Sequence, residues 1–226
     1  KTGYPAAKLV AAEALQCPTL LANGFGDHRI EGIGDKHVPW VHDVKSTDFI
    51  VAVDDEVPMR LLRLFNEPAG REVLANQGIS ADLVNQLDLL GISGIGNLLA
   101  AVKFAKYYEL TENDHVVTIA TDSMQLYQSR LGELTAENGA YETNQAERDL
   151  ELLFSISIDY MQELGYYDRK RIHNLKYFTW IEQQGRDVQE LNDQWYDHEK
   201  YWGGAFGQLD TIESLIQDFN DRVGIL

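Results

Sequence analysis

The chain has 226 residues, 44% of them hydrophobic, which suits one large domain or two small ones with a real core. Its 36 acidic and 19 basic residues give a formal net charge of −17. A field of that sign repels phosphate backbones and anionic lipid surfaces, so we expect neither nucleic acid nor a membrane as a partner. The single cysteine, Cys17, suits a reducing compartment. We expect a cytoplasmic protein in which Cys17 is a buried thiol.

The first half of the sequence alternates between strand and helix patterns. KLVAAEAL at 8–15 favours a short buried strand, although its alanines leave a helix open. A long connection rich in Gly, Pro and His follows over 16–47. DFIVAV at 48–53 is apolar throughout, as buried parallel strands are. Asp54 is a good N-cap for a helix through DDEVPMRLLRLF, residues 54–65.

Two short helices are expected next, over EPAGREVLANQ (67–77) and SADLVNQLDLL (80–90). Residues 89–110 combine a short apolar lead-in, a glycine-rich turn and an amphipathic helix. DHVVTIATDS at 114–123 is the strongest strand pattern in the sequence, and MQLYQSRLGEL (124–134) favours a helix. This alternation predicts an α/β fold with a parallel sheet covered by helices.

From about residue 132 onward the pattern is helical only. Helices are expected over 146–165, 169–185, 187–202 and 210–223, the first two ending at Gly165 and Gly185. We therefore divide the chain into an α/β body, residues 1–131, and an all-helical C-terminal extension, residues 132–226.

Three side chains of the extension, Trp195, His198 and Trp202, fall on one face of a helix. That face packs against the body or a sister subunit, or it covers an active site.

Two stretches stand where a parallel sheet binds ligands, at the carboxyl ends of strands. Thr121, Asp122 and Ser123 follow a predicted strand, and they either cap the next helix or contact a ligand. Gly91-Ile92-Ser93-Gly94-Ile95-Gly96-Asn97 is either a tight turn or a loop whose backbone N–H groups face an anion. Its G-x-x-G-x-G spacing matches neither the dinucleotide fingerprint nor the P-loop.

The stretch HRIEGIGDKHVPWVHD (28–43) carries His28, His37 and His42. Zinc sites use closer pairs such as H-x3-H or CxxC, so we predict no metal site. The sequence also lacks the G-x-S-x-G elbow of a serine nucleophile.

Taken in order, four segments resemble one family, the cysteine synthases and cystathionine β-synthases. Residues 28–43, followed by DFIVAVDDE (48–56), resemble its H-x-I-x-G-I-G stretch and D-x-V-x-V-x-D-E strand. GISGIGNLLAAVKFAK (91–106) resembles its glycine/serine turn and following helix. VVTIATDSMQLYQS (116–129) resembles its strand ending in D-S-x-x-x-Y, and AAEALQCPTL (11–20) resembles an earlier E-P-x-x-S/C-P-like segment.

The resemblance implies a fold-type II pyridoxal-phosphate (PLP) enzyme with the tryptophan-synthase-β-like fold, of which residues 1–131 are the C-terminal part of the PLP-binding body. It implies PLP as cofactor, an amino-acid substrate and a homo-oligomer. Ser123 matches the serine that hydrogen-bonds the pyridine nitrogen. The other residues implied to lie beside the cofactor are Gly32, Ile33 and Gly34, in a backbone turn, and Gly91, Ser93 and Gly94, near the cofactor's edge.

In this family the Schiff-base lysine, the asparagine-bearing substrate loop and the Gly/Thr phosphate loop lie earlier in the chain. None of those motifs occurs here, so we assign no catalytic residue and expect a missing N-terminal half or a partner chain. The implied activity is that of a lyase or transferase, a β-elimination or β-replacement at Cα and Cβ of an amino acid. Extra helical material over 66–88 departs from the family and leaves the substrate open.

Two other interpretations remain. The chain is the PLP-binding subunit of a two-component aminoketone thiolase, or it is a non-catalytic α/β module that binds a partner.

Overall fold

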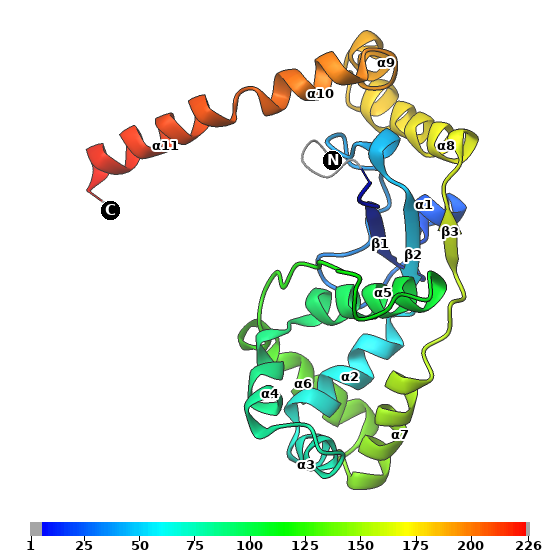
Figure 1. Ribbon diagram of the computed structural model, residues 1–226, viewed down its shortest axis with the longest axis vertical. Coiled ribbons are helices and arrows are strands. Elements are labelled where there is room, and N and C mark those ends of the chain that lie inside the picture. Colours follow the sequence, from blue (N-terminus) through cyan, green and yellow to red (C-terminus); the bar gives the residue numbers. More distant parts are fainter. Residues whose placement is uncertain (1–5, 225–226) are drawn as a thin grey trace.

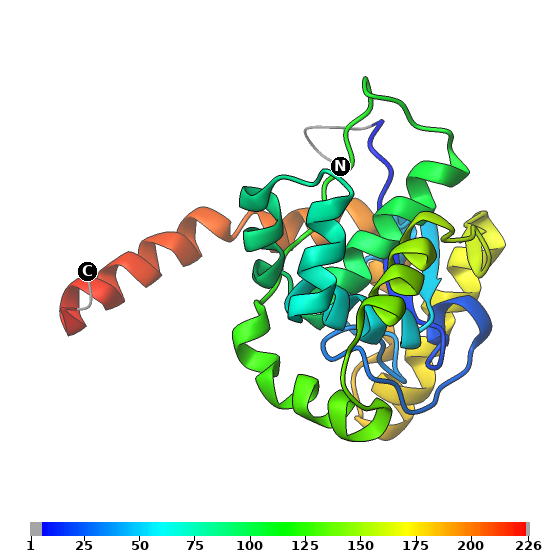
Figure 2. The same ribbon diagram turned by 90° about the horizontal axis from the view of Figure 1, so that it is seen from below.

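A small sheet lies at the centre of the molecule, with helices packed at both of its ends (Figure 1). The computed structural model describes residues 6–224. The last two helices of the chain extend away from the body as an arm, which both views show (Figures 1 and 2). The sheet and the helices that cover it therefore hold the predicted site, and the arm lies outside this body.

The sheet has three strands in the order β1–β2–β3. β1 (Val10–Ala14) and β2 (Phe49–Val53) are parallel, with Val10 opposite Phe49, which confirms both predicted strands. β3 (Met161–Glu163) is antiparallel on the other side of β2. The expected parallel sheet is therefore a mixed sheet with one parallel pair.

β2 is apolar throughout because both of its faces are covered. Phe49, Val51 and Val53 belong to the main hydrophobic cluster, which also contains α2 and α5 side chains. Ile50 points to the opposite face and packs with Leu20, on the side of the loop that follows β1. The alternation of side chains along a strand thus supplies both layers of the core.

The helices of the main cluster follow the order predicted from the sequence. They are α2 (Glu56–Asn66), α3 (Pro68–Asn76), α4 (Ala81–Gln86), a 3₁₀ turn (Leu87–Leu89), α5 (Ile92–Tyr107), α6 (Gln128–Asn138) and α7 (Thr143–Phe154). α5 packs on β2 and α2, while α7 packs on α2 and α3.

The residue before α2 differs from the prediction. Asp55 is the N-cap, and Asp54 instead accepts a hydrogen bond from the Glu56 N–H through Oδ1, 3.1 Å away. The aspartate pair thus closes a short turn between β2 and α2, and Asp54 supports the helix start from one position further out.

The strongest strand pattern in the sequence does not form a strand. Residues 114–123 run as an open coil, exposed over 114–121, and the helix expected after them begins with a 3₁₀ turn (Met124–Tyr127). Strand propensity reflects packing on a pleated surface, so it produces a strand only where a neighbouring strand is present. Among residues 6–224, no strand pairs with this segment.

The all-helical description of the extension is wrong in one place. The second half of the predicted helix 146–165 contains β3, whose short polar sequence Met-Gln-Glu gives no strand signal. Gly165 is consequently the N-cap of the next helix, whereas Gly185 adopts the left-handed conformation expected after a helix end, with φ +67°.

The remaining helices are α8 (Tyr166–Lys176), which continues into a π-helix (Tyr177–Gln183), α9 (Val188–Tyr196), α10 (His198–Phe206) and α11 (Leu209–Val223). The single helix expected over 187–202 is broken at Asp197, which separates α9 from α10.

The extension docks on the loop between β1 and β2 through a buried ammonium group. Lys176 is fully buried, and its Nζ donates to Trp40 O, His42 O and Gln194 Oε1 at 2.7–2.9 Å. Trp195 is buried there as well, and His198 Nε2 is 2.8 Å from Asp43 Oδ1. Trp195, His198 and Trp202 thus lie on the side of the body, but on two helices, because the break at Asp197 separates Trp195 on α9 from the other two on α10.

Cys17 is buried, as predicted. No single helix within residues 6–224 is long and apolar enough to cross a membrane. One pair, residues 81–89 with α5, meets the length and composition together but bends by 116° at the break between them.

Candidate functional site

The glycine loop after β1 folds back on the end of that strand. Gly32 and Gly34 have φ values of +85° and +95°, a region that favours glycine. His28 Nε2 lies 2.9 Å from Gly34 O. A Cβ on Gly34 would lie 2.9 Å from the His28 ring and 3.2 Å from Ala14 Cβ. The backbone turn at 32–34 is thus fixed by its own conformation and by close packing.

The start of α5 supplies the second part of the site. Gly91 is the N-cap, and Ser93 and Gly94 lie in the first turn of the helix, so the expected glycine-rich turn is helical and buried. Gly91 N–H donates to Asp122 O at 2.9 Å. A Cβ on Gly91 would lie 2.0 Å from Asp122 Oδ1, so only glycine allows this approach.

Residues 119–123 are held against the start of α5. The hydroxyls of Ser93 and Thr121 are hydrogen-bonded at 2.5 Å, and Asn97 Nδ2 donates to Ile119 O at 3.0 Å. Tyr127 donates its hydroxyl proton to Asp122 Oδ2, 2.5 Å away. Burial, and then the hydrogen bond to Asp122, raises the pKa of Tyr127 to about 12, so the phenol stays protonated as a donor.

Ser123 keeps its side chain free at this point. It is the N-cap of the following 3₁₀ turn, but its hydroxyl makes no capping hydrogen bond. Within residues 6–224, Ser123 Oγ has no hydrogen-bond partner. Capping therefore does not account for the hydroxyl, which leaves it available to a ligand.

The three parts of the predicted site meet at one place. A Cβ on Gly32 would lie 3.6 Å from Ser93, which itself bonds Thr121. Ile33 packs along α5, within 3.4 Å of the position a Gly96 Cβ would occupy. The glycine loop, the α5 N-terminus and the turn at 121–123 thus lie side by side, although they are far apart in sequence.

Sequence reasoning gave Tyr127 no role and named Asp122 only as a capping or ligand-contacting residue, yet the contact between the two holds the turn in place. The D-S-x-x-x-Y spacing, already noted in the sequence, is the signal that could have identified the pair.

The histidines of the loop have separate partners. His37 Nδ1 lies 3.0 Å from Thr179 Oγ1, and His42 Nε2 lies 2.9 Å from Thr47 Oγ1. Across residues 6–224, no group of three or more His, Cys, Asp or Glu side chains could hold a metal ion.

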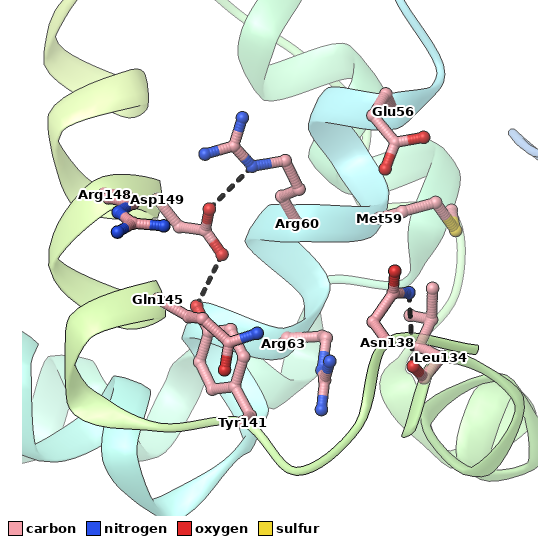
Figure 3. A pocket seen from close by; sticks show the side chains of 10 residues that line it. All are labelled: Glu56, Met59, Arg60, Arg63, Leu134, Asn138, Tyr141, Gln145, Arg148 and Asp149. Carbon is pink, nitrogen blue, oxygen red and sulfur yellow. Dashed lines mark hydrogen bonds and ion pairs between the residues drawn. The ribbon is translucent and has the colours of Figure 1, made fainter. Parts of the chain in front are cut away.

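A polar pocket of about 220 Å³ lies elsewhere, between α2, α6 and α7 (Figure 3). Arg60 Nε donates to Asp149 Oδ1 at 2.6 Å, and Tyr141 donates to Asp149 Oδ2 at 2.7 Å. Both carboxylate oxygens of the buried Asp149 are thus satisfied by the protein. The pocket contains none of the predicted site residues, and its network ties α7 to the body.

The described residues offer contacts for only part of a PLP molecule. The free Ser123 hydroxyl can meet a ring nitrogen, and the turn at 32–34 presents backbone without bulky side chains. The buried lysines Lys103 and Lys176 already donate to backbone oxygens elsewhere, and the described residues contain no glycine/threonine phosphate loop. The described residues could therefore hold the ring, but not the phosphate.

Comparison with known proteins gives a distant similarity. No family model matches the chain, and no solved structure matches it significantly. Cysteine synthases from Staphylococcus aureus strains Mu50 and N315 are each 28% identical over 129 residues, which are 57% of this chain and 36% of each relative. A cystathionine beta-synthase from Saccharomyces cerevisiae is 31% identical over 102 residues, 45% of this chain and 17% of the relative.

The chain thus spans about a third of the length of the cysteine synthases that it matches. The similarity supports the family resemblance seen in the sequence, at the level of a distant relationship to enzymes of amino-acid metabolism.

Proposed function

We propose that this chain forms one side of the cofactor site of a PLP-dependent enzyme that performs β-elimination or β-replacement on an amino acid. The observation that carries the proposal is the meeting of the glycine loop 28–34, the start of α5 and the turn 121–123, with Ser123 Oγ left without a partner. The similarity to cysteine synthases and a cystathionine beta-synthase supports the choice of reaction class.

In this proposal Ser123 binds the pyridine nitrogen. A hydroxyl is too weak an acid to keep that nitrogen protonated, so bound PLP would supply an electron sink of moderate strength, suited to proton loss from Cα and to departure or addition at Cβ. Asp122 and Tyr127 position the serine, because their hydrogen bond fixes the turn that carries it. The turn at 32–34 leaves room for the substrate beside the ring.

The phosphate loop and the covalent lysine anchor are proposed to come from polypeptide outside residues 1–226. The phosphate needs backbone N–H groups in a glycine-rich loop, and the lysine needs an uncharged amine that can reach the ring. Residues 1–226 alone are then expected to show no turnover with amino acids.

The test compares Ser123→Ala with Ser129→Ala in the longest form of the protein found in its natural source. Ser129 lies nearby on α6, is exposed, and serves as a matched control. The proposal expects Ser123→Ala to keep the fold, to change the absorption and fluorescence of bound PLP, and to lower turnover by up to about tenfold, the equivalent of one lost hydrogen bond of about 0.5–1.5 kcal/mol. Spectra and turnover equal to those of Ser129→Ala would contradict it.

A further inference from the structure

The outer edge of β1 has no partner strand among residues 6–224. In a parallel pair, alternate residues of a strand bond the neighbour and the others face away. Leu9 O and Leu15 N–H form hydrogen bonds with the backbone of β2 and of the residue before it. The odd-numbered residues of β1 therefore direct their backbone groups toward β2. The backbone N–H and C=O groups of Val10 and Ala12 therefore face the open edge, where a further strand can bond them.

A second unpartnered element lies next to this edge. The coil 114–121 carries the strongest strand pattern in the sequence, and its large apolar side chains lie in solvent: Val117 is 91% exposed and Ile119 is 70% exposed. Figure 2 shows this segment rising from the end of α5 beside the dark-blue segment that leads into β1, residues 6–9. The sequence pattern predicts a strand packed against neighbours, whereas the side chains lie in solvent. The absence of a neighbouring strand explains this difference.

A hollow of about 610 Å³ separates the two elements. Val10 and Ala12 line it on the β1 side, and Val116 and Val117 line it on the side of the coil. Its floor is formed by α5, where Ala100, Ala101 and Phe104 face it. Small alanine side chains let another backbone approach the helix closely, and the walls are mostly apolar.

We propose that this hollow binds one further β-strand, which forms backbone hydrogen bonds with β1 on one side and with residues 116–121 on the other. The strand is contributed by the part of the natural polypeptide that lies outside residues 1–226. Its face toward α5 is apolar, because Ala100, Ala101 and Phe104 line the hollow there.

One observation favours this occupant. The cysteine synthases matched by the chain have almost two thirds of their length outside the matched region, so such relatives contain polypeptide that can supply a strand.

Filling the hollow turns the three-stranded sheet into a five-stranded one. It also fixes residues 116–121 as a strand, which holds the Thr121 hydroxyl on Ser93 and sets the position of the turn at 121–123. The open edge, the unpaired segment and the hollow carry this proposal, and it shares with the proposed function only the premise that the natural polypeptide extends beyond residues 1–226.

The test is hydrogen exchange followed by mass spectrometry on two samples: the protein isolated intact from its natural source, and residues 1–226 alone. The proposal expects amides of 116–121 to exchange at unfolded-chain rates in residues 1–226 and about 100-fold or more slowly in the natural protein, as ordered strands do. A natural protein in which these amides exchange freely would overturn it. Protection that arises from a second copy or a separate chain, seen by native mass, would also overturn it.

A pair of variants makes the same test site-specific. Val117 lines the hollow, whereas Leu126 is also exposed, at 71%, and does not. In the natural protein, Val117→Asp should abolish the protection of 116–121, because a carboxylate would be buried against the added strand. Leu126→Asp is the control. A Val117→Asp protein that keeps as much protection as the control would contradict the proposal.

Discussion

Two regions of the molecule differ in how many of their polar groups and apolar side chains find partners within the chain. Where the extension docks on the loop between β1 and β2, Lys176 has three hydrogen-bond acceptors and Trp195 is buried. At the hollow beside β1, a strand edge is open and Val117 is 91% exposed. The docking region finds most of its partners within the chain, although Trp202 Nε1 is buried there without a hydrogen-bond partner among the described residues. The hollow, by contrast, is proposed to take a strand from outside residues 1–226.

The largest effect is expected from removing the Lys176 amine, which lies at the centre of the region where the extension docks on the loop between β1 and β2. Lys176→Met would leave Gln194 Oε1 buried without a donor and would remove one of two donors from both Trp40 O and His42 O. An unsatisfied buried acceptor costs about 1–3 kcal/mol and each other lost hydrogen bond about 0.5–1.5 kcal/mol, so we expect the free energy of unfolding to fall by about 2–5 kcal/mol in a urea titration. Lys200→Met is the control, since its side chain is 84% exposed, and it should change stability by less than about 0.5 kcal/mol. Equal effects of the two would show that the buried ammonium does not hold the extension.

Acid should loosen the same region. Burial, followed by the nearby Lys176 charge, lowers the pKa of both His42 and His173 to about 4. The unfolded chain, with histidine pKa values near 6.5, binds more protons than the fold between about pH 6.5 and 4, so the free energy of unfolding falls as pH falls through that window. Each histidine contributes about 3 kcal/mol at about 1.4 kcal/mol per pKa unit.

Urea titrations across this pH range measure the slope. His173→Asn should reduce it, while replacing the exposed His115 with Asn should not. An unchanged slope in His173→Asn would contradict the assignment.

The packing at the start of α5 gives a smaller effect. Gly91→Ala places a Cβ 2.0 Å from Asp122 Oδ1, so we expect a loss of about 1–3 kcal/mol together with displacement of the turn that carries Ser123. Gly132→Ala on α6 is the control, because nothing lies within 4 Å of its added Cβ and alanine favours the helix by about 0.5–1 kcal/mol. Thermal unfolding separates the two variants, and a stable Gly91→Ala protein would show that the close approach is not required.

The smallest effect is expected in the open region. In residues 1–226 alone, Val117→Thr should change stability by less than about 0.5 kcal/mol, since the side chain is already in water. Val51→Thr places a hydroxyl in the core and should cost about 1–3 kcal/mol. A large loss at Val117 would mean that the coil is already packed in this chain.

The sequence predicted β1, β2 and the order of α2 to α6 because these elements carry their own apolar period and lie on one core. It failed at 114–123, where the local pattern is that of a strand but the neighbour is absent, and at β3, where three polar residues become a strand only by pairing with β2. Both failures concern pairing partners, which local propensity does not encode.

For the candidate site, sequence reasoning identified the three segments but not their contacts. The glycine pattern located the turn at 32–34, and the structure adds that Gly34 packs on His28 and Ala14. The Ser93–Thr121 and Asp122–Tyr127 contacts depend on how α5 meets the coil, so they could be found only in three dimensions.

The measurement that tests the central claim most directly is the visible absorption spectrum of the protein isolated from its natural source, recorded together with its intact mass. The account predicts a bound-PLP band in a polypeptide well above the mass of a 226-residue chain. A colourless protein with the mass of these 226 residues, which takes up no added PLP, would contradict it.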